Sequence, residues 1–280
     1  MAGLRTVSEH RCFGGTQGFY RHESDSCGSM GFSVFLPPES DGAPVLYFLA
    51  GLTCTEETFM IKAGAQRLAS ELGLALVAPD TSPRGTAYEG ATDDWDFGEG
   101  AGFYLDATEA PWRGRFNMYS YVTEELPALV AKEFDVDAER MSIFGHSMGG
   151  HGALTIALKN PQRYRSVSAF APIVAASEVP WGQKALPRYL GDDRHRWADY
   201  DACRLLERGT FPDTILIDQG MVDPFLVEQL QPERFEAACE RSGQALELRR
   251  HDGYDHGYYF ISTFLADHLY HHAERLGARS

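Results

Sequence analysis

Short apolar runs alternate with longer segments of helical periodicity along most of the chain. Several of the runs are continuously apolar, which is typical of strands buried on both faces of a sheet. The strands predicted from these runs cover residues 31–37, 45–51, 74–80, 140–146, 164–172, 214–220 and 245–253. The helices predicted between them lie near residues 55–72, 118–134, 148–160, 226–242 and 257–275. This alternation predicts βαβ units, and hence a mainly parallel sheet covered by helices.

Two long segments, residues 81–117 and 173–212, lack the alternation and are rich in Gly, Pro, Trp and acidic residues. Loops of this length are uncommon in a compact domain and often act as lids or binding loops. We expect them to contact a ligand; surface decoration is the alternative. No repeat, low-complexity tract or linker interrupts the pattern, so residues 1–280 are predicted to form a single domain.

Composition narrows the class of function. Of the 280 residues, 44% are hydrophobic and 23% are charged, which is ordinary for a globular protein with a sizeable core. The formal net charge of -15 argues against nucleic-acid binding, which needs clustered Lys and Arg, and indicates mainly solubility. The cysteines are odd in number and lack C-x-x-C spacing, so neither a disulfide framework nor a zinc site is expected.

The N-terminal sequence and the length of the apolar segments indicate in which cellular compartment the protein is expected. The N-terminus has no apolar stretch of signal-peptide length, and no segment approaches the roughly 18 apolar residues that span a bilayer. Together with the cysteine usage, this predicts a cytoplasmic protein in a reducing compartment, without membrane association.

The stretch Gly145-His146-Ser147-Met148-Gly149 matches G-x-S-x-G and lies between a predicted strand and a predicted helix. In a nucleophile elbow, the serine occupies a strained strand-to-helix turn, and flanking glycines let neighbouring backbones approach. The required strand and helix make this match much more specific than the five-residue pattern alone. Ser147 is therefore predicted to be a nucleophile; a packing turn with an incidental serine is the alternative.

A serine nucleophile needs a base and an orienting carboxylate, which follow it in the order acid, then His, in α/β-hydrolases. Asp218 and Asp223 follow the nucleophile near the end of one strand. Asp218 closes that strand and is expected to fix backbone structure, so Asp223, further into the loop, is preferred. His251 belongs to the end of the last strand, whereas His256 lies in a Gly-flanked loop before the final helix. His256 is therefore the predicted base.

Five other histidines are not expected to take part in catalysis. Those on the closing helix are expected to be solvated, and those that flank the serine are too close to it to serve as its base. The first group comprises His268, His271 and His272, and the second His146 and His151. Spacing of i, i+5 does not bring two imidazoles together on one helix face, so no metal site and no cofactor are expected.

An oxyanion formed at the serine needs preorganised N–H donors. One is expected from Met148, which follows the nucleophile at a helix N-terminus. The other is expected from the loop "AGLTCTEETF", with the N–H of Leu52 as the candidate. Cys54 lies two residues further on and is predicted near the site, although a small buried hydrophobe is the alternative.

Longer runs of sequence carry a family resemblance over nearly the whole chain. They include "RCFGG" (11–15), "GLTCTEETF" (51–59), "APDTSPRG" (78–85), "DDWDFGEGAGFYLDATEAPW" (93–112), "YSYVTEELP" (119–127), "MSIFGHSMGGHGAL" (141–154), "SAFAPI" (168–173), "LIDQG" (216–220) and "GYDHGYYF" (253–260). In these runs the chain closely resembles the S-formylglutathione hydrolase (esterase D) family. It departs at Thr86, where the family often has Cys, and in the first half of "ASEVPWGQKALPRYL".

The resemblance implies an α/β-hydrolase fold, with a mostly parallel sheet and helices on both faces. It implies hydrolysis of the thioester S-formylglutathione to glutathione and formate, the last step of glutathione-dependent formaldehyde oxidation. It carries the catalytic roles over to Ser147, Asp223 and His256, and the oxyanion donors to Leu52 and Met148. The expected partner is thus a small glutathione thioester, and the family suggests a homodimer.

Three other functions remain open from the sequence. A general short-chain carboxylesterase would use the same triad, since members of the family also hydrolyse simple esters. An acyltransferase with this triad is also possible. A ligand-binding protein that has lost catalysis is disfavoured, because all three triad candidates are present.

Overall fold

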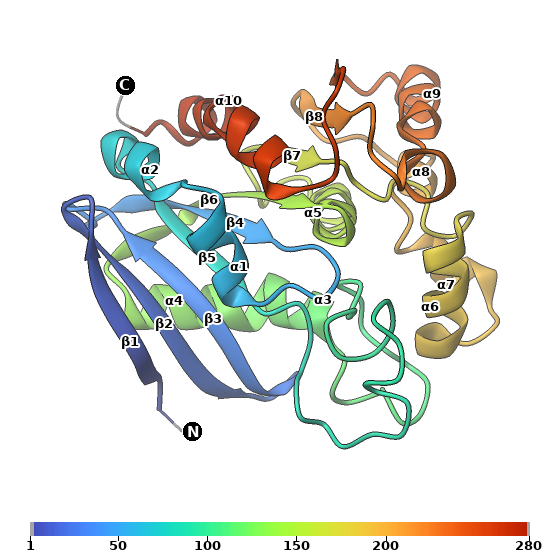
Figure 1. Cartoon of the computed structure of the whole chain (residues 1–280), viewed down its shortest axis with the longest axis horizontal. Coiled ribbons are helices and arrows are strands. Elements are labelled where there is room, and N and C mark those ends of the chain that lie inside the picture. Colours follow the sequence, from blue (N-terminus) through green and yellow to red (C-terminus); the bar gives the residue numbers. More distant parts are fainter. Residues whose placement is uncertain (1–2, 279–280) are drawn as a thin grey trace.

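Nine strands form one mixed sheet in the computed structural model, which describes residues 3–278 (Figure 1). The strands lie side by side in the order β1-β2-β3-β5-β4-β6-β7-β8-β9. Their bounds are β1 (Arg5–Cys12), β2 (Gly15–Ser24), β3 (Gly28–Leu36), β4 (Ala43–Leu49), β5 (Ala75–Pro79), β6 (Val136–His146), β7 (Val167–Phe170), β8 (Ile215–Gly220) and β9 (Leu246–His251).

The predicted parallel sheet is confirmed for the six strands β4 to β9, which pair in parallel throughout. All seven predicted strands are present. The N-terminal part of the sheet differs, because β1, β2 and β3 pair antiparallel and β3 joins β5 antiparallel. The sequence pattern missed β1 and β2. β1 is a mostly exposed edge strand with the polar sequence RTVSEHRC, so it lacks the apolar pattern by which a strand is recognised.

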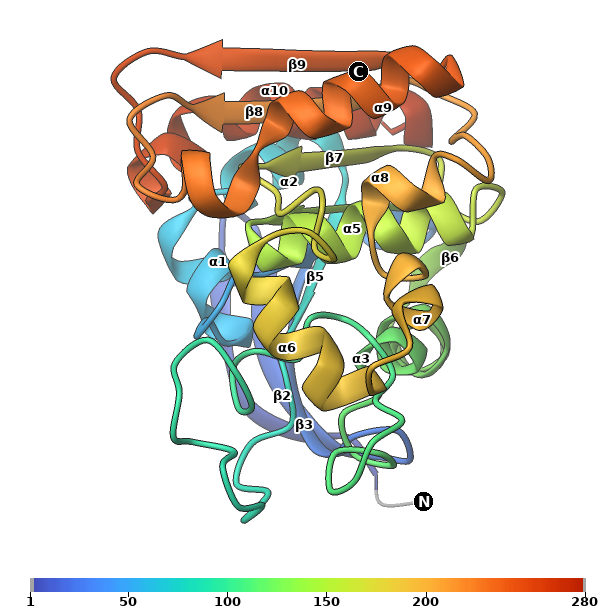
Figure 2. The ribbon, with the colours of Figure 1, turned by 90° about the vertical axis from the view of Figure 1, so that its right-hand side faces the viewer.

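Helices cover both faces of the sheet. Their bounds are α1 (Glu56–Lys62), α2 (Gln66–Leu72), α3 (Met118–Ser120), the π-helical turn η1 (Tyr121–Glu125), α4 (Leu126–Glu133), α5 (Met148–Lys159), α6 (Pro180–Leu190), α7 (Arg194–Ala198), α8 (Ala202–Leu205), the π-helical turn η2 (Leu226–Leu230), α9 (Pro232–Ser242) and α10 (Tyr258–Leu276). Helices α5, α8 and α9 lie in front of the strands in Figure 2, and α2 and α10 lie behind them. Within residues 3–278, no helix combines the length and apolarity needed to cross a bilayer.

Two of the five predicted helices are divided in the structure. The segment 55–72 breaks into α1 and α2 around Gly64, whose φ of 75° is accessible to glycine at little cost. The segment 226–242 breaks at Gln231, whose φ is 44° and which precedes Pro232. A proline cannot continue the hydrogen bonding of a preceding helical turn, so α9 starts afresh there.

The segments 81–117 and 173–212 pack against each other beside the carboxyl edge of the sheet. Segment 81–117 contains no helix or strand of its own, whereas 173–212 forms the short helices α6, α7 and α8. The hydroxyl of Tyr189 joins them, because it accepts a hydrogen bond from Gly98 N–H at 3.0 Å and donates to the carbonyl of Ala101 at 3.0 Å. The Tyr189 ring also stacks on Phe97. The two segments therefore form one packed unit rather than independent flaps.

The expectation of solvated histidines on the closing helix is wrong for two of the three. His268 and His272 of α10 are fully buried against the sheet, and His271 is partly buried. The His272 ring lies between two serine hydroxyls, with Nδ1 2.7 Å from Ser166 Oγ and Nε2 2.8 Å from Ser168 Oγ. Histidine can enter a core when both ring nitrogens find partners in this way.

Candidate active site

Ser147 occupies the turn between β6 and α5 with a φ of 58° and a ψ of -120°. Such a conformation is rare for a residue with a side chain and is held by the surrounding backbone. Ser147 N–H donates to the Phe170 carbonyl at 3.0 Å, and the Ser147 carbonyl accepts from His151 N–H at 2.9 Å and Ile173 N–H at 3.3 Å. The strained turn places Ser147, which is buried, at the carboxyl edge of the sheet, where a nucleophile elbow lies.

The glycines of the motif permit close backbone approach. A Cβ added to Gly149 would lie 1.9 Å from the Leu49 carbonyl oxygen, and one added to Gly145 would lie 2.2 Å from the Gly149 carbonyl oxygen. Both positions therefore exclude any side chain. These contacts bring the first turn of α5 against the end of β4, and so set Ser147 beside the loop that follows β4.

Asp223 and His256 form a hydrogen-bonded pair beyond the ends of β8 and β9. The distance from Asp223 Oδ2 to His256 Nδ1 is 2.5 Å, and Asp223 is buried. The other carboxylate oxygen of Asp223, Oδ1, accepts a hydrogen bond from the Phe225 N–H at 2.8 Å, which fixes the orientation of the side chain. A carboxylate at Nδ1 keeps the proton on that nitrogen, which leaves Nε2 of His256 as the basic atom of the ring.

One cavity of about 100 Å³ brings the predicted site residues together. Its lining consists of Gly51, Leu52, Cys54, Trp95, His146, Ser147, Trp181, Phe225 and His256. Ser147 and His256 thus line the same cavity, although they are 109 positions apart in the sequence. Asp223 is not part of the lining, since it reaches the cavity only through His256.

The N–H groups of the two predicted oxyanion donors, Leu52 and Met148, are not used in hydrogen bonds among the described residues. The loop that carries Leu52 is a tight turn, with Thr53 at a φ of 69° and Cys54 N–H donating to the Gly51 carbonyl at 3.2 Å. Met148 is the first residue of α5, where unpaired N–H groups and the helix dipole favour negative charge.

Five rings form a continuous aromatic row from Trp95 to His146, the residue that precedes Ser147. The centroid distances between successive rings are 5.8 Å for Trp95 and Trp181, 4.8 Å for Trp181 and Phe225, 5.0 Å for Phe225 and His256, and 4.4 Å for His256 and His146. The aromatic row leaves an apolar surface beside the serine. Sequence reasoning did not find Trp95, Trp181, Phe225 or His146 as lining residues. Two of them, Trp95 and Trp181, come from the segments without a regular pattern.

Ion pairs hold the outer end of this row. Lys184 Nζ lies 2.5 Å from Asp96 Oδ1 and 3.2 Å from Asp94 Oδ2, and Arg188 Nη1 lies 3.3 Å from the same Asp94 oxygen. The paired carboxylates flank Trp95 in segment 81–117, whereas Lys184 is on α6 with Trp181. These contacts therefore tie the two long segments together where their tryptophans meet.

Cys54 lies in the cavity and is partly buried. Burial raises the pKa of its thiol, against smaller lowering effects from a Thr58 hydrogen bond and from the charges of Lys62 and Arg84. The thiol is consequently protonated near neutral pH and is a weak nucleophile.

Asp218 and His251, the alternatives to Asp223 and His256 that the sequence analysis set aside, have partners elsewhere. Asp218 forms a two-bond ion pair with Arg249, with both distances 2.6 Å, and lies 3.2 Å from His251 Nε2 and from His268 Nε2. These contacts lower the pKa of Asp218 in spite of its burial. Asp218 and His251 thus link β8, β9 and α10 and do not reach the cavity.

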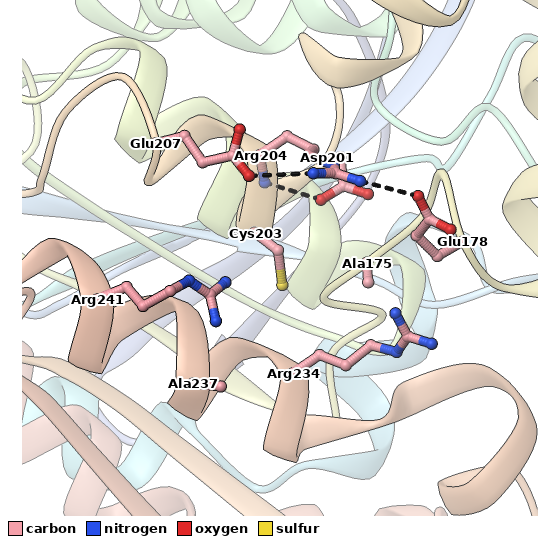
Figure 3. A pocket seen from close by; sticks show the side chains of 9 residues that line it. All are labelled: Ala175, Glu178, Asp201, Cys203, Arg204, Glu207, Arg234, Ala237 and Arg241. Carbon is pink, nitrogen blue, oxygen red and sulfur yellow. Dashed lines mark hydrogen bonds and ion pairs between the residues drawn. The ribbon is translucent and has the colours of Figure 1, made fainter.

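A larger cavity of about 230 Å³ lies between α8, α9 and the segment after β7 (Figure 3). Its carboxylates are engaged, since Arg204 contacts both Glu178 and Glu207 at 3.1 Å. Its one thiol, on Cys203, has a pKa raised by burial. The residues that line it include no histidine and no serine, so no activated nucleophile is assembled there, and the candidate active site is the cavity at Ser147.

Comparison with known proteins agrees with this geometry. A family model described as "Putative esterase" matches residues 26–271. Curated S-formylglutathione hydrolases match along nearly the entire chain: the Mus musculus protein is 55% identical and the Arabidopsis thaliana protein 52% identical, each over 98% of this chain and 99% of its own length. The chain belongs to the S-formylglutathione hydrolase family.

A solved structure of the family shows the same fold. The S-formylglutathione hydrolase from Agrobacterium tumefaciens superposes with a TM-score of 0.95 at 55% identity, covering 97% of this chain and 99% of that one. More distant esterase structures share the fold alone, for example a ferulic acid esterase with a TM-score of 0.69 at 18% identity. The predicted α/β-hydrolase fold is therefore confirmed.

Proposed function

We propose that Ser147, Asp223 and His256 are the catalytic triad of a thioester hydrolase whose substrate is S-formylglutathione. The observation that carries this proposal is the bonded Asp223–His256 pair, whose imidazole shares one small cavity with a serine in a strained elbow. The substrate is inferred from the curated relatives, which are named S-formylglutathione hydrolase and are similar along the whole chain.

In the acylation step, Ser147 Oγ attacks the formyl carbon while His256 Nε2 takes the hydroxyl proton. Asp223 holds the Nδ1–H tautomer and stabilises the imidazolium that forms. The charge that develops on the formyl oxygen is stabilised by the N–H groups of Leu52 and Met148. Since neither N–H is donated to a protein acceptor within residues 3–278, no hydrogen bond need be broken for them to bind the oxyanion.

The C–S bond then breaks, leaving a formyl ester on Ser147 and releasing the sulfur of glutathione. A cysteine thiol has a pKa of about 8.5, so it leaves readily as the thiolate or with the proton held by His256. A water molecule, deprotonated by His256, attacks the formyl ester in the same geometry. Its products are formate and the regenerated Ser147 hydroxyl.

The cavity favours small acyl groups. At about 100 Å³ it has room beside Ser147 for a small acyl group such as formyl or acetyl. The aromatic row closes one side of this space, and within it Trp181 and Phe225 stand between the mouth and His256. The size of the cavity thus supports a small acyl group in the proposed substrate.

A general short-chain carboxylesterase is the second candidate. It is favoured by one observation, that none of the nine residues lining the cavity is a Lys or Arg. Nothing inside the cavity selects a charged thioester over a neutral ester of the same acyl group. Discrimination between these functions must therefore come from contacts outside it.

The test compares kcat/KM for S-formylglutathione with that for p-nitrophenyl acetate. A preference of at least about 100-fold for the thioester, equivalent to roughly 2.7 kcal/mol of transition-state stabilisation, is expected. Equal efficiencies would favour the carboxylesterase instead. In parallel, S147A is expected to lower kcat about 10⁴-fold or more and to abolish labelling by a fluorophosphonate.

The remaining assignments are also proposals. The single sheet that runs through the described chain supports one domain over residues 1–280. The five cysteines are free thiols, which supports a reducing compartment such as the cytoplasm. A homodimer is proposed from the family resemblance, and sedimentation equilibrium would test it.

A further inference from the structure

The cavity at Ser147 cannot hold the tripeptide part of the proposed substrate. At about 100 Å³ it accommodates the formyl group and the sulfur, so most of glutathione must lie across the rim. At neutral pH glutathione carries two carboxylates and one ammonium group, a net charge of -1. The protein has a formal net charge of -15. An anionic substrate therefore needs a local cation near the mouth to offset this repulsion.

Lys62 is a cation in that position. It is the last residue of α1, the helix that follows the Leu52–Cys54 loop, and its side chain is exposed. Its Nζ lies 5.7 Å from the centroid of the Tyr258 ring, which lies 6.2 Å from the ring of the lining residue His146. Its charge also acts on the thiol of Cys54, another lining residue. The contact with Tyr258, together with the place of Lys62 at the end of the helix after the Leu52–Cys54 loop, thus puts Lys62 near the rim.

The other cations around the mouth are already paired. Lys184 is shared between Asp94 and Asp96, and Arg84 is bound to Asp80 at 3.0 Å. Within residues 3–278, by contrast, Lys62 has no carboxylate within ion-pair distance and donates no hydrogen bond. Its charge is available to a ligand, and the face of the Tyr258 ring holds the ammonium group near the rim.

We propose that Lys62 binds a carboxylate of the glutathione moiety and so selects the thioester over neutral esters. This inference rests on the proposed function, because it concerns the same substrate. Lys62 does not touch the reacting atoms, so it affects binding and leaves the chemical step unchanged. An ion pair at an exposed position changes affinity modestly, by about two- to fivefold, and its effect weakens as salt screens it.

The experiment measures kcat and KM of K62M for S-formylglutathione and p-nitrophenyl acetate at low salt and at 0.5 M NaCl, an ionic strength chosen to shorten the screening length to roughly 4 Å. K62M is expected to raise KM for the thioester about two- to fivefold at low salt, with kcat unchanged. Its kinetics with the neutral ester are expected to equal those of the wild type. The salt dependence of KM for the thioester should also be smaller than in the wild type.

Three further variants make the test specific. K132M removes one positive charge from α4, where Lys132 is exposed and pairs with Glu133, so it has the same net charge as K62M. It should behave as the wild type. K62R should retain a low KM, and K62E should raise KM for the thioester more than K62M does.

A second comparison uses a modified substrate. S-formylglutathione monoethyl ester, which lacks the glycine carboxylate, should give the same KM with wild type and K62M if that carboxylate is the partner. If K62M still weakens its binding, the γ-glutamyl carboxylate is the partner, and the proposal stands.

Equal KM values of wild type and K62M for S-formylglutathione would overturn the proposal, as would an equal effect of K62M and K132M. Failure of the proposed function gives a different result, because wild-type protein would then show no preference for the thioester at all.

Discussion

The imidazole rings of His146 and His256 lie 4.4 Å apart, centroid to centroid, at an interplanar angle of 46°. Within residues 3–278, neither ring nitrogen of His146 has a hydrogen-bond partner, and the side chain is buried. Burial, and secondly the neighbouring His256, hold the pKa of His146 well below its usual value. His146 is therefore neutral, and it contacts His256 as a flat aromatic surface. In the mechanism that we propose, the proton from Ser147 goes to His256 alone.

We predict that this contact, and not a hydrogen bond, is what His146 contributes. H146F should keep kcat within about twofold of wild type, whereas H146N, which retains a polar atom but no ring, should lower it about 3- to 10-fold, in line with an aromatic contact of roughly 0.5–1.5 kcal/mol. KM should be unchanged in both. Steady-state kinetics across pH 5–9 would check this, with circular dichroism to confirm folding. High activity in H146N with low activity in H146F would contradict it.

Gly149 should tolerate no side chain. The Cβ of G149A would meet the Leu49 carbonyl oxygen at 1.9 Å and the Ala50 carbonyl oxygen at 2.6 Å, both of which are backbone atoms at the end of β4. The variant must displace either α5 or the loop that carries Leu52, so activity should be lost. Its free energy of unfolding should fall by about 1–3 kcal/mol, as in other overpacked sites. G209A is the matched control, because a Cβ there meets nothing within 4 Å; urea denaturation compares the two.

The sequence predicts best those parts of the site that are formed by residues close together in the chain. The continuous apolar run of β6, the glycines around Ser147 and the helix after them identify the elbow without any knowledge of distant contacts. The choices of Asp223 and His256 required only chain order and the expectation that parallel strands end at one edge of the sheet. The distance between them is a product of the fold, since 33 positions separate the two residues.

The cavity walls could not be predicted in this way. Trp95 and Trp181 belong to segments without periodicity, and the Lys184–Asp96 ion pair that relates them spans 88 positions. The burial of His268 and His272, by contrast, did have a signal. Both fall on the same helical stripe as Ile261, Leu265 and Leu269, which are buried. A stripe of period 3.6 therefore indicated burial more strongly than the polarity of the residue type indicated exposure.

These two histidines should make the protein sensitive to acid. Burial lowers the pKa of His268 and lowers that of His272 well below its usual value, whereas in the unfolded chain both are near 6.5. Below that pH the unfolded state binds protons that the folded state does not. The folded state therefore keeps its full free energy of unfolding, as far as these two histidines are concerned, above about pH 6.5. Below that pH each histidine lowers the free energy of unfolding by up to about 1.4 kcal/mol per pH unit.

The measurement is urea denaturation at pH 7.5, 6.5 and 5.5. H272L should be less stable than wild type at pH 7.5, by about 1–3 kcal/mol, because the Ser166 and Ser168 hydroxyls each lose one of their hydrogen-bond partners. It should also lose less stability on acidification. H10Q, at an exposed position of β1, should keep the wild-type dependence. An unchanged pH dependence in H272L would show that His272 is not one of the groups responsible.

The ion pairs beside Trp95 should determine how firmly the mouth of the cavity is held. Asp96 is largely buried at 13% side-chain exposure and Lys184 is one-third exposed, so water screens this pair less than a fully exposed one. A double-mutant cycle of K184M and D96N should therefore give a coupling of about 0.5–1 kcal/mol in the free energy of unfolding. The pair Arg67–Glu71 on α2, with side chains 73% and 57% exposed, is the control. Its cycle should give a coupling close to zero.

The same ion pairs should also influence the kinetics. Loss of the Lys184 contacts frees segment 81–117 at Trp95, so K184M should raise KM for p-nitrophenyl acetate while kcat stays constant, because the triad is untouched. High salt should also raise the KM of the wild type for p-nitrophenyl acetate, because it screens the ion pairs. It should change the KM of K184M less, because that variant lacks the Lys184 charge. Tryptophan emission should shift to longer wavelength in K184M, since Trp95 would lose its contact with Trp181. A coupling energy near zero, with unchanged emission, would mean that the rings alone hold the mouth of the cavity.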